Sequence, residues 1–157
     1  MSVRNLTAVA SFVLVFASLA VAQSSLETKW HCAKPVDQQY EIGDTPGHSY
    51  GVAQGNCNVV SGKTGEKTGV FTEIQEMWNG SFQTHGRMIV TMADGEKIYY
   101  TYKATGSLAK KTAAEKWKMT GGTGKHKSNK GSGTCSGTFN DDGTSDWVCS
   151  GKFSTGA

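Results

Sequence analysis

The sequence predicts an all-β protein, an antiparallel barrel of about eight strands with short loops. Beyond residue 22, apolar and polar residues alternate with a period of two, and no stretch of helical length carries an apolar stripe with a 3.6-residue period. Glycine-rich turn sequences separate these segments at short, regular intervals. A single open sheet of this length would leave long unpaired edges, which favours closure into a barrel. A two-sheet sandwich is the alternative.

The amino-terminal 22 residues have the pattern of a secretory signal peptide. Arg4 precedes an apolar stretch, and Ala20-Val21-Ala22 matches the small-x-small pattern of a cleavage site. The apolar stretch is shorter than the roughly 20 residues that a helix needs to span a bilayer. We therefore expect cleavage near Ala22 and one domain over residues 23–157, secreted or periplasmic, with no stable membrane insertion.

The strands follow from the alternation and from the turns between them. Asn79-Gly80 predicts a tight hairpin, and Ala93-Asp94-Gly95 predicts the next turn. Residues 108–116 contain Ala113, Ala114 and Glu115 and could form a short helical turn. The predicted strands are residues 29–32, 50–60, 70–78, 82–92, 97–103, 117–122, 131–139 and 145–153.

Four cysteines predict two disulfides in an exported chain. A hairpin centred on the turn at Asp142 places Cys135 opposite Cys149 and Gly137 opposite Trp147, so that aromatic rings lie over glycines. Elimination then pairs Cys32 with Cys57. The cysteines have no C-x-x-C spacing and no histidine at ligand spacing, so we expect no metal site and no cofactor.

The wall that faces the barrel lumen is predicted from the apolar alternation. Its members are Trp78, Met88, Val90, Tyr100 and Tyr102, with Ile74 nearby. We expect these residues to bind an apolar or aromatic small molecule, or else to fill the lumen as an inert core. His85 and Arg87 have the opposite parity and are expected outside, as are His48 and His126.

Glu76 is the one carboxylate that interrupts the apolar series from Ile74 to Trp78. If this face points inward, partial desolvation raises the pKa of Glu76 and makes it a candidate catalytic acid or base. The alternative places Glu76 near the barrel end, paired with a lysine or with solvent.

The charge of the chain argues against binding to nucleic acid. The formal net charge is only +3, whereas a general binder needs several phosphates neutralised. Lysines are dense between residues 110 and 130, where they form either a solvated surface or a basic rim that attracts an anion.

A glycine-rich corner carries a resemblance to a known family. Gly121-Gly122-Thr123-Gly124-Lys125-His126, followed by Gly131-Ser132-Gly133, resembles the G-G-T-G-[KR]-[FY] element of dirigent proteins and allene oxide cyclases, which are calycin-type β-barrels. Consecutive glycines allow positive φ and close backbone approach where a strand ends and the chain turns. His126 departs from the pattern, because the family places an aromatic ring there.

The resemblance covers roughly residues 66–155 and implies a barrel that binds hydrophobic or amphipathic small molecules at its mouth. Some members of this group guide radical coupling or cyclisation by shape. Two functions follow as expectations: an exported binding protein, or a cofactor-free cyclase, isomerase or coupling guide built on the same barrel.

Overall fold

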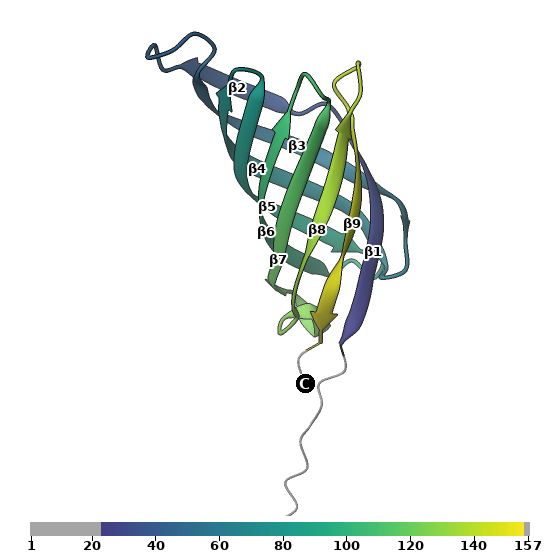
Figure 1. Ribbon diagram of the computed structural model, residues 1–157. Helices are drawn as coiled ribbons and strands as arrows, with labels where there is room; N and C mark the ends of the chain where they lie inside the picture. The colour runs from purple at the N-terminus through teal and green to yellow at the C-terminus, as the bar shows by residue number, and fades with distance from the viewer. Residues whose placement is uncertain (1–22, 156–157) are drawn as a thin grey trace, which may run out of the picture.

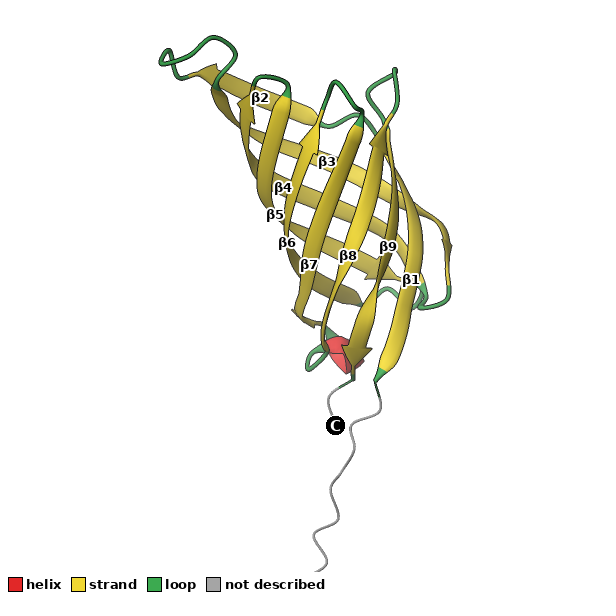
Figure 2. Cartoon of the chain, in the orientation of Figure 1, coloured by secondary structure: helices red, strands yellow, loops and turns green. Residues whose placement is uncertain are grey.

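The computed structural model describes residues 23–155, and nearly all of them lie in β-strands (Figures 1 and 2). The expected signal peptide, residues 1–22, lies outside the described residues. No helix among the described residues is long and apolar enough to cross a membrane. The strands are β1 (Ser24–Cys32), β2 (Val36–Glu41), β3 (Ser49–Gly62), β4 (Glu66–Trp78), β5 (Ser81–Met92), β6 (Lys97–Ser107), β7 (Thr112–Gly122), β8 (Lys130–Phe139) and β9 (Ser145–Ser154), with a short 3-10 helix, η1 (Gly124–His126), before β8.

Eight of the strands close into an antiparallel barrel. Each strand from β3 to β9 pairs with its neighbour in the sequence, and β1 pairs with β9 on one side and with the second half of β3 on the other. This double pairing of β1 leaves no free edge at the seam, so the fold is a barrel and not the alternative sandwich. The ninth strand, β2, pairs with the first half of β3 and lies at the upper end of the barrel in Figure 1.

Two disulfides reinforce the wall. Cys32 and Cys57 are register partners across the β1–β3 seam, with Cα atoms 3.9 Å apart. Cys135 and Cys149 face each other in the β8–β9 hairpin, with Cα atoms 4.0 Å apart. The sequence predicted both pairs, Cys135–Cys149 from the hairpin register and Cys32–Cys57 by elimination. Two disulfides fit a protein that folds in an oxidising compartment outside the cytosol.

The lower half of the barrel, toward η1, is packed with side chains. Trp117 extends from β7 across two strands, and it finds room because Gly133 and Gly151 carry no side chain beneath its ring. Gly137 likewise lies under the ring of Trp147. The buried cluster in this half contains Leu26, Val90, Met92, Ile98, Tyr100, Trp117 and Met119.

The glycine-rich corner joins β7 to β8. Gly121 and Gly124 adopt positive φ angles of 139° and 50°, a region that residues with a side chain rarely adopt. Gly122 lies against His126, whose Cβ would be 2.8 Å from a Cβ at this glycine. The ring of His126 is only 12% exposed, so the expectation of an external histidine is wrong here. Gly131 and Gly133 follow on the inner face of β8.

One local prediction from the sequence is wrong, and one strand was not predicted. Residues 108–111 form a turn and Thr112 already begins β7, so the helical turn expected over residues 108–116 is absent. Alanine and glutamate favour helices in isolation, but pairing with β6 and β8 overrides that preference. The strand β2 was not predicted, because most of its side chains are exposed and its residues show no apolar alternation.

Candidate functional site

The upper half of the lumen is a cavity of about 490 Å³. It reaches the turns at residues 108–111 and 140–144, which lie at the upper end of the barrel in Figure 2. Its apolar lining comes mainly from residues on the inner faces of seven strands and from Leu108. These are chiefly Trp30, Phe71, Met77, Phe82, Met88, Phe139 and Trp147, together with both disulfides. The barrel is therefore filled at one end and hollow at the other.

Four of the five residues predicted to line the lumen point into it. Met88 and Tyr102 border the large cavity. Val90, which is 1% exposed, and Tyr100 belong to the packed lower half. Trp78 does not line the lumen, because it lies on the outer wall with half of its surface exposed.

The error at Trp78 extends along β4. Ile74 is 62% exposed, while Phe71, Glu73, Gln75 and Met77 face the lumen. The apolar alternation gives the period of a strand, but the outer residues of β4 are as apolar as the inner ones. The more polar inner face was therefore assigned to the outside.

Glu76 consequently lies on the outer wall. Its Oε1 accepts a hydrogen bond from the Tyr50 hydroxyl at 2.8 Å, and it lies 3.1 Å from Nε2 of His48. The amide of Gln83 also donates to this carboxylate. These partners, Tyr50 first, lower the pKa of Glu76, so the predicted upward shift and the role as a lumen acid or base are wrong.

His48 completes this outer cluster: it lies outside the lumen, as expected, but its side chain is buried. Its ring stacks on Trp78, with centroids 5.0 Å apart, and its Nδ1 lies 2.8 Å from Oδ1 of Asp44. The hydrogen bonds to Glu76 and Asp44 raise the pKa of His48, because both favour the imidazolium. The cluster of His48, Asp44, Glu76 and Trp78 holds the β2–β3 loop against β4.

The carboxylate that does enter the lumen from β4 is Glu73. Its Oε2 accepts the Tyr102 hydroxyl at 2.7 Å and its Oε1 accepts the Gln75 amide at 2.7 Å. Gln75 in turn accepts from the amide of Gln39 on β2, also at 2.7 Å. Burial and the neighbouring charge of Glu73 raise the pKa of Tyr102, which remains a hydrogen-bond donor.

A second carboxyl, Glu115 of β7, faces the same cavity. No N–H or O–H group of the described side chains donates to it, and Sγ of Cys135 lies 3.3 Å from its Oε1. That sulfur is in a disulfide and carries no proton. Burial, with a contribution from the charge of Glu73, raises the pKa of Glu115 to about 8. Glu115 is therefore largely protonated at neutral pH.

Thr84 of β5 adds a third polar group to the cavity wall. Its hydroxyl oxygen is buried and has no hydrogen-bond partner among the described residues. Buried polar groups without partners are rare and costly in folded proteins. Thr84 and Glu115 thus leave unused hydrogen-bonding capacity on the inner wall.

Sequence reasoning missed Glu73, Thr84 and Glu115. In residues 70–78 the alternation was assigned to the wrong face, which put Glu73 outside. In residues 82–92 the inner face was assigned correctly and Thr84 shares the parity of Met88 and Val90, but Thr84 was not singled out as a polar group of the lumen. Glu115 was assigned to a helical turn. The signal that could have found it is the parity with Trp117 and Met119, which are apolar residues two and four positions further on.

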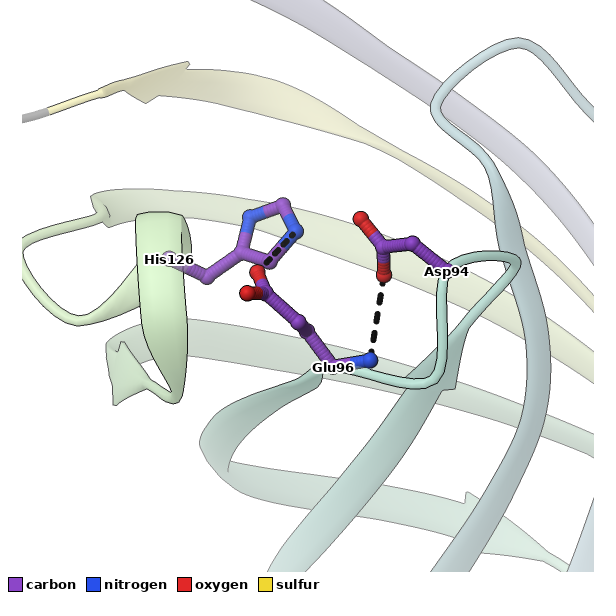
Figure 3. Close-up of side chains that lie close together, drawn as sticks. All are labelled: Asp94, Glu96 and His126. Carbon is purple, nitrogen blue, oxygen red and sulfur yellow. Dashed lines mark hydrogen bonds and ion pairs between the residues drawn. The ribbon is translucent and has the colours of Figure 1, made fainter.

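At the opposite end of the barrel, Asp94, Glu96 and His126 lie close together (Figure 3). Each offers one ligand atom, and these atoms lie within 4.8 Å of one another. Nζ of Lys125 lies 2.6 Å from Oδ2 of Asp94, and this contact lowers the pKa of Asp94. A metal ion at these three residues would have to compete with Lys125. The sequence showed no such cluster because its members come from two separate turns.

Comparison with protein-family models and with curated proteins gives no match to this chain. The function is therefore inferred from the lumen and its lining.

Proposed function

We propose that this protein is an exported β-barrel that binds a small hydrophobic or aromatic molecule in the cavity of its lumen. The single observation that carries the proposal is the open, largely apolar cavity of about 490 Å³ in the upper half of the barrel. Ligand pockets for small molecules have volumes of roughly 300 to 1,000 Å³, with an apolar lining and a few polar groups.

The polar groups of the wall support a binding role over an inert core. Thr84 is buried without a hydrogen-bond partner, and Glu115 is partly buried and receives no hydrogen bond from an N–H or O–H group of the described side chains. Leaving such groups unpaired costs stability. A bound molecule that hydrogen-bonds to them would offset this cost. An inert core would be more stable with apolar side chains at these positions.

Export is the second part of the proposal. The signal-peptide pattern of residues 1–22 and the two disulfides both suit a periplasmic or secreted protein. The resemblance to dirigent proteins and allene oxide cyclases agrees with a barrel that takes a small molecule at its mouth.

Thermal unfolding with a panel of apolar and aromatic compounds tests the binding function. A ligand that binds the folded state raises Tm with its concentration. The variant Ala104→Phe fills the cavity from β6, while Thr105→Phe places the same ring on the outer face of the same strand as a matched control. We expect Ala104→Phe to lose the ligand-dependent rise in Tm and Thr105→Phe to keep it, with far-UV circular dichroism reporting the fold of both.

Native mass spectrometry of the protein purified from its own host would reveal a retained molecule directly. If the compounds bind at the outer wall instead, Tm rises equally in Ala104→Phe and Thr105→Phe. An equal rise in both variants, or no ligand-dependent change in Tm for any compound of the panel, would exclude the cavity as a binding site.

A cofactor-free isomerase or cyclase is the second candidate, and one arrangement favours it. Glu115 is a protonated carboxyl at neutral pH, and Glu73, in the same cavity, accepts hydrogen bonds at both oxygens as a carboxylate does. A proton donor and a proton acceptor that border one largely apolar cavity suit acid–base chemistry. Turnover of an epoxide or a phenoxy-radical substrate that is lost in Glu115→Gln and kept in Glu76→Gln would support this function over simple binding.

A further inference from the structure

The ionisable side chains of the lumen are uniformly acidic. Among the described strands, the inner positions hold three glutamates and no lysine, arginine or histidine. Glu66 lies deepest and accepts hydrogen bonds from Thr28, Thr64 and Tyr100, so its charge is compensated within the packed half. Glu73 and Glu115 remain, and both border the large cavity.

The mouth of the cavity does not neutralise this pair. Lys111 at the rim forms an ion pair with Asp141. Lys34 also borders the cavity, but so does Asp37, which carries the opposite charge. The rim is thus balanced in charge, and two carboxyl groups inside have no basic partner.

Aromatic rings surround the same space. Trp30, Phe71 and Trp147 border the cavity that contains Glu73 and Glu115. The faces of aromatic rings attract cations, most strongly where water is excluded. An acidic, aromatic lumen is therefore complementary to a positively charged organic group and repels an anion.

We propose that the ligand of this barrel is an organic cation, an aromatic or aliphatic amine whose ammonium group lies between Glu73 and Glu115 while its apolar part fills the upper lumen. This inference rests on the proposed binding function and specifies the chemistry of its ligand. Thr84 offers its free hydroxyl to the same group or to a second polar atom of the ligand.

Three compounds of similar size distinguish charge from shape. Benzyltrimethylammonium is permanently cationic, neopentylbenzene is its neutral isostere, and phenylacetate is an anion. Each is titrated into the full mature protein, with displacement of a bound apolar fluorescent probe as the readout. We expect benzyltrimethylammonium to bind at least about tenfold more tightly than neopentylbenzene, and phenylacetate to bind more weakly than both.

Variants then assign the preference to the two carboxyl groups. Glu73→Gln and Glu115→Gln should each weaken binding of the cation about tenfold or more and leave binding of neopentylbenzene within about twofold. Glu76→Gln is the matched control, because it removes a carboxylate from the outer wall of the same barrel. It should leave the affinity for all three compounds unchanged.

The unmodified protein provides a test that does not depend on the folding of variants. Cation binding favours loss of the proton from Glu115, so affinity for benzyltrimethylammonium, which does not titrate, should rise between pH 6 and pH 8. The groups that face Glu115 across the lumen are Glu73 from β4 and Tyr102 from β6, beside the Cys135–Cys149 disulfide, with Glu66 below and Lys34, Asp37, Lys111 and Asp141 at the mouth. Binding of neopentylbenzene should not change over this range.

The outcomes separate the two proposals. If neopentylbenzene binds as tightly as the cation, or if the cation is insensitive to pH and to both glutamate substitutions, the organic-cation inference is wrong while the binding function stands. If none of the three compounds displaces the probe, and the probe itself does not bind, the cavity is not a ligand site and both proposals fail.

Discussion

The Tyr102 hydroxyl donates a hydrogen bond to Glu73 across a strand that lies between them. The two residues are 2.7 Å apart at Oη and Oε2, one on β6 and the other on β4, and the residue between them on β5 is Gly86. A Cβ at Gly86 would overlap the Tyr102 ring and lie 2.8 Å from Cβ of Glu73. The absence of a side chain on β5 is therefore what lets tyrosine reach the lumen carboxylate.

Gly86→Ala should destabilise the barrel and separate Tyr102 from Glu73. Overpacking of a fitted interior costs about 1 to 3 kcal/mol, and the backbone of β5 cannot move away without breaking two ladders. Denaturation in urea should show this loss in the free energy of unfolding. Arg87→Ala, on the outer face of the same strand, should change it by less than about 0.5 kcal/mol. Equal stability of Gly86→Ala and the parent protein would mean that the ring does not cross β5.

The β8–β9 hairpin could be predicted because its information is local. The turn around Asp142 sets the register, and the register sets the partners Cys135 and Cys149 as well as Gly137 and Trp147. The barrel class was predictable for a related reason, since period-two alternation and repeated turns describe strands wherever they pair. No knowledge of distant contacts was needed for either.

The candidate site could not be predicted in the same way. Alternation in β4 leaves its phase undetermined, because Ile74 and Trp78 on the outside are as apolar as Phe71 and Met77 on the inside. The hollow end of this barrel has polar residues such as Glu73 and Thr84 on its inner face, which reverses the usual rule for a core. The proximity of Glu115 to Glu73 arises from closure of the barrel, and sequence spacing contains no record of it.

Removal of the β8–β9 disulfide should cost about 3 kcal/mol. Cys135 and Cys149 are separated by 14 residues, and the cross-link reduces the conformational freedom of the unfolded chain accordingly. The double variant Cys135→Ala/Cys149→Ala avoids a free thiol, and its unfolding in guanidinium chloride measures the difference. The fully reduced parent protein should be less stable than the oxidised double variant. Reduction breaks both disulfides of the parent, whereas the oxidised variant keeps Cys32–Cys57. An unchanged midpoint in the double variant would contradict the expected contribution.

The outer cluster should report the titration of His48 through Trp78. The pKa of His48 is raised above 6.5 and that of Glu76 is lowered below 4.5, so their attraction is complete between these values. It weakens as pH rises through the raised histidine value and as pH falls through the lowered glutamate value. The emission of Trp78 is obtained as the difference in fluorescence between the parent protein and Trp78→Phe. Followed against pH, this difference should change with a midpoint above pH 6.5. Glu76→Gln should move this midpoint downward, and a midpoint at or below 6.5 in the parent would contradict the contact.

Glu115 should make the barrel less stable as pH rises toward 8. Its pKa is near 8 in the folded protein against 4.5 in an unfolded chain, so the folded state binds the additional proton between these values. Stability is therefore highest below about pH 4.5 with respect to this group and falls by roughly 1.4 kcal/mol per pH unit until pH passes 8. Glu115→Gln resembles the protonated carboxyl and cannot ionise. We expect it to match the parent near pH 4.5 and to exceed it in free energy of unfolding at pH 8, as measured by urea denaturation across this range.

The control Glu76→Gln should instead have a lower free energy of unfolding than the parent at pH 8, since it loses a contact that is present only above the lowered pKa of Glu76. Parallel curves for Glu115→Gln and the parent would show that Glu115 is solvated, and the cavity would then lack the buried acid on which both the binding and the catalytic proposals draw.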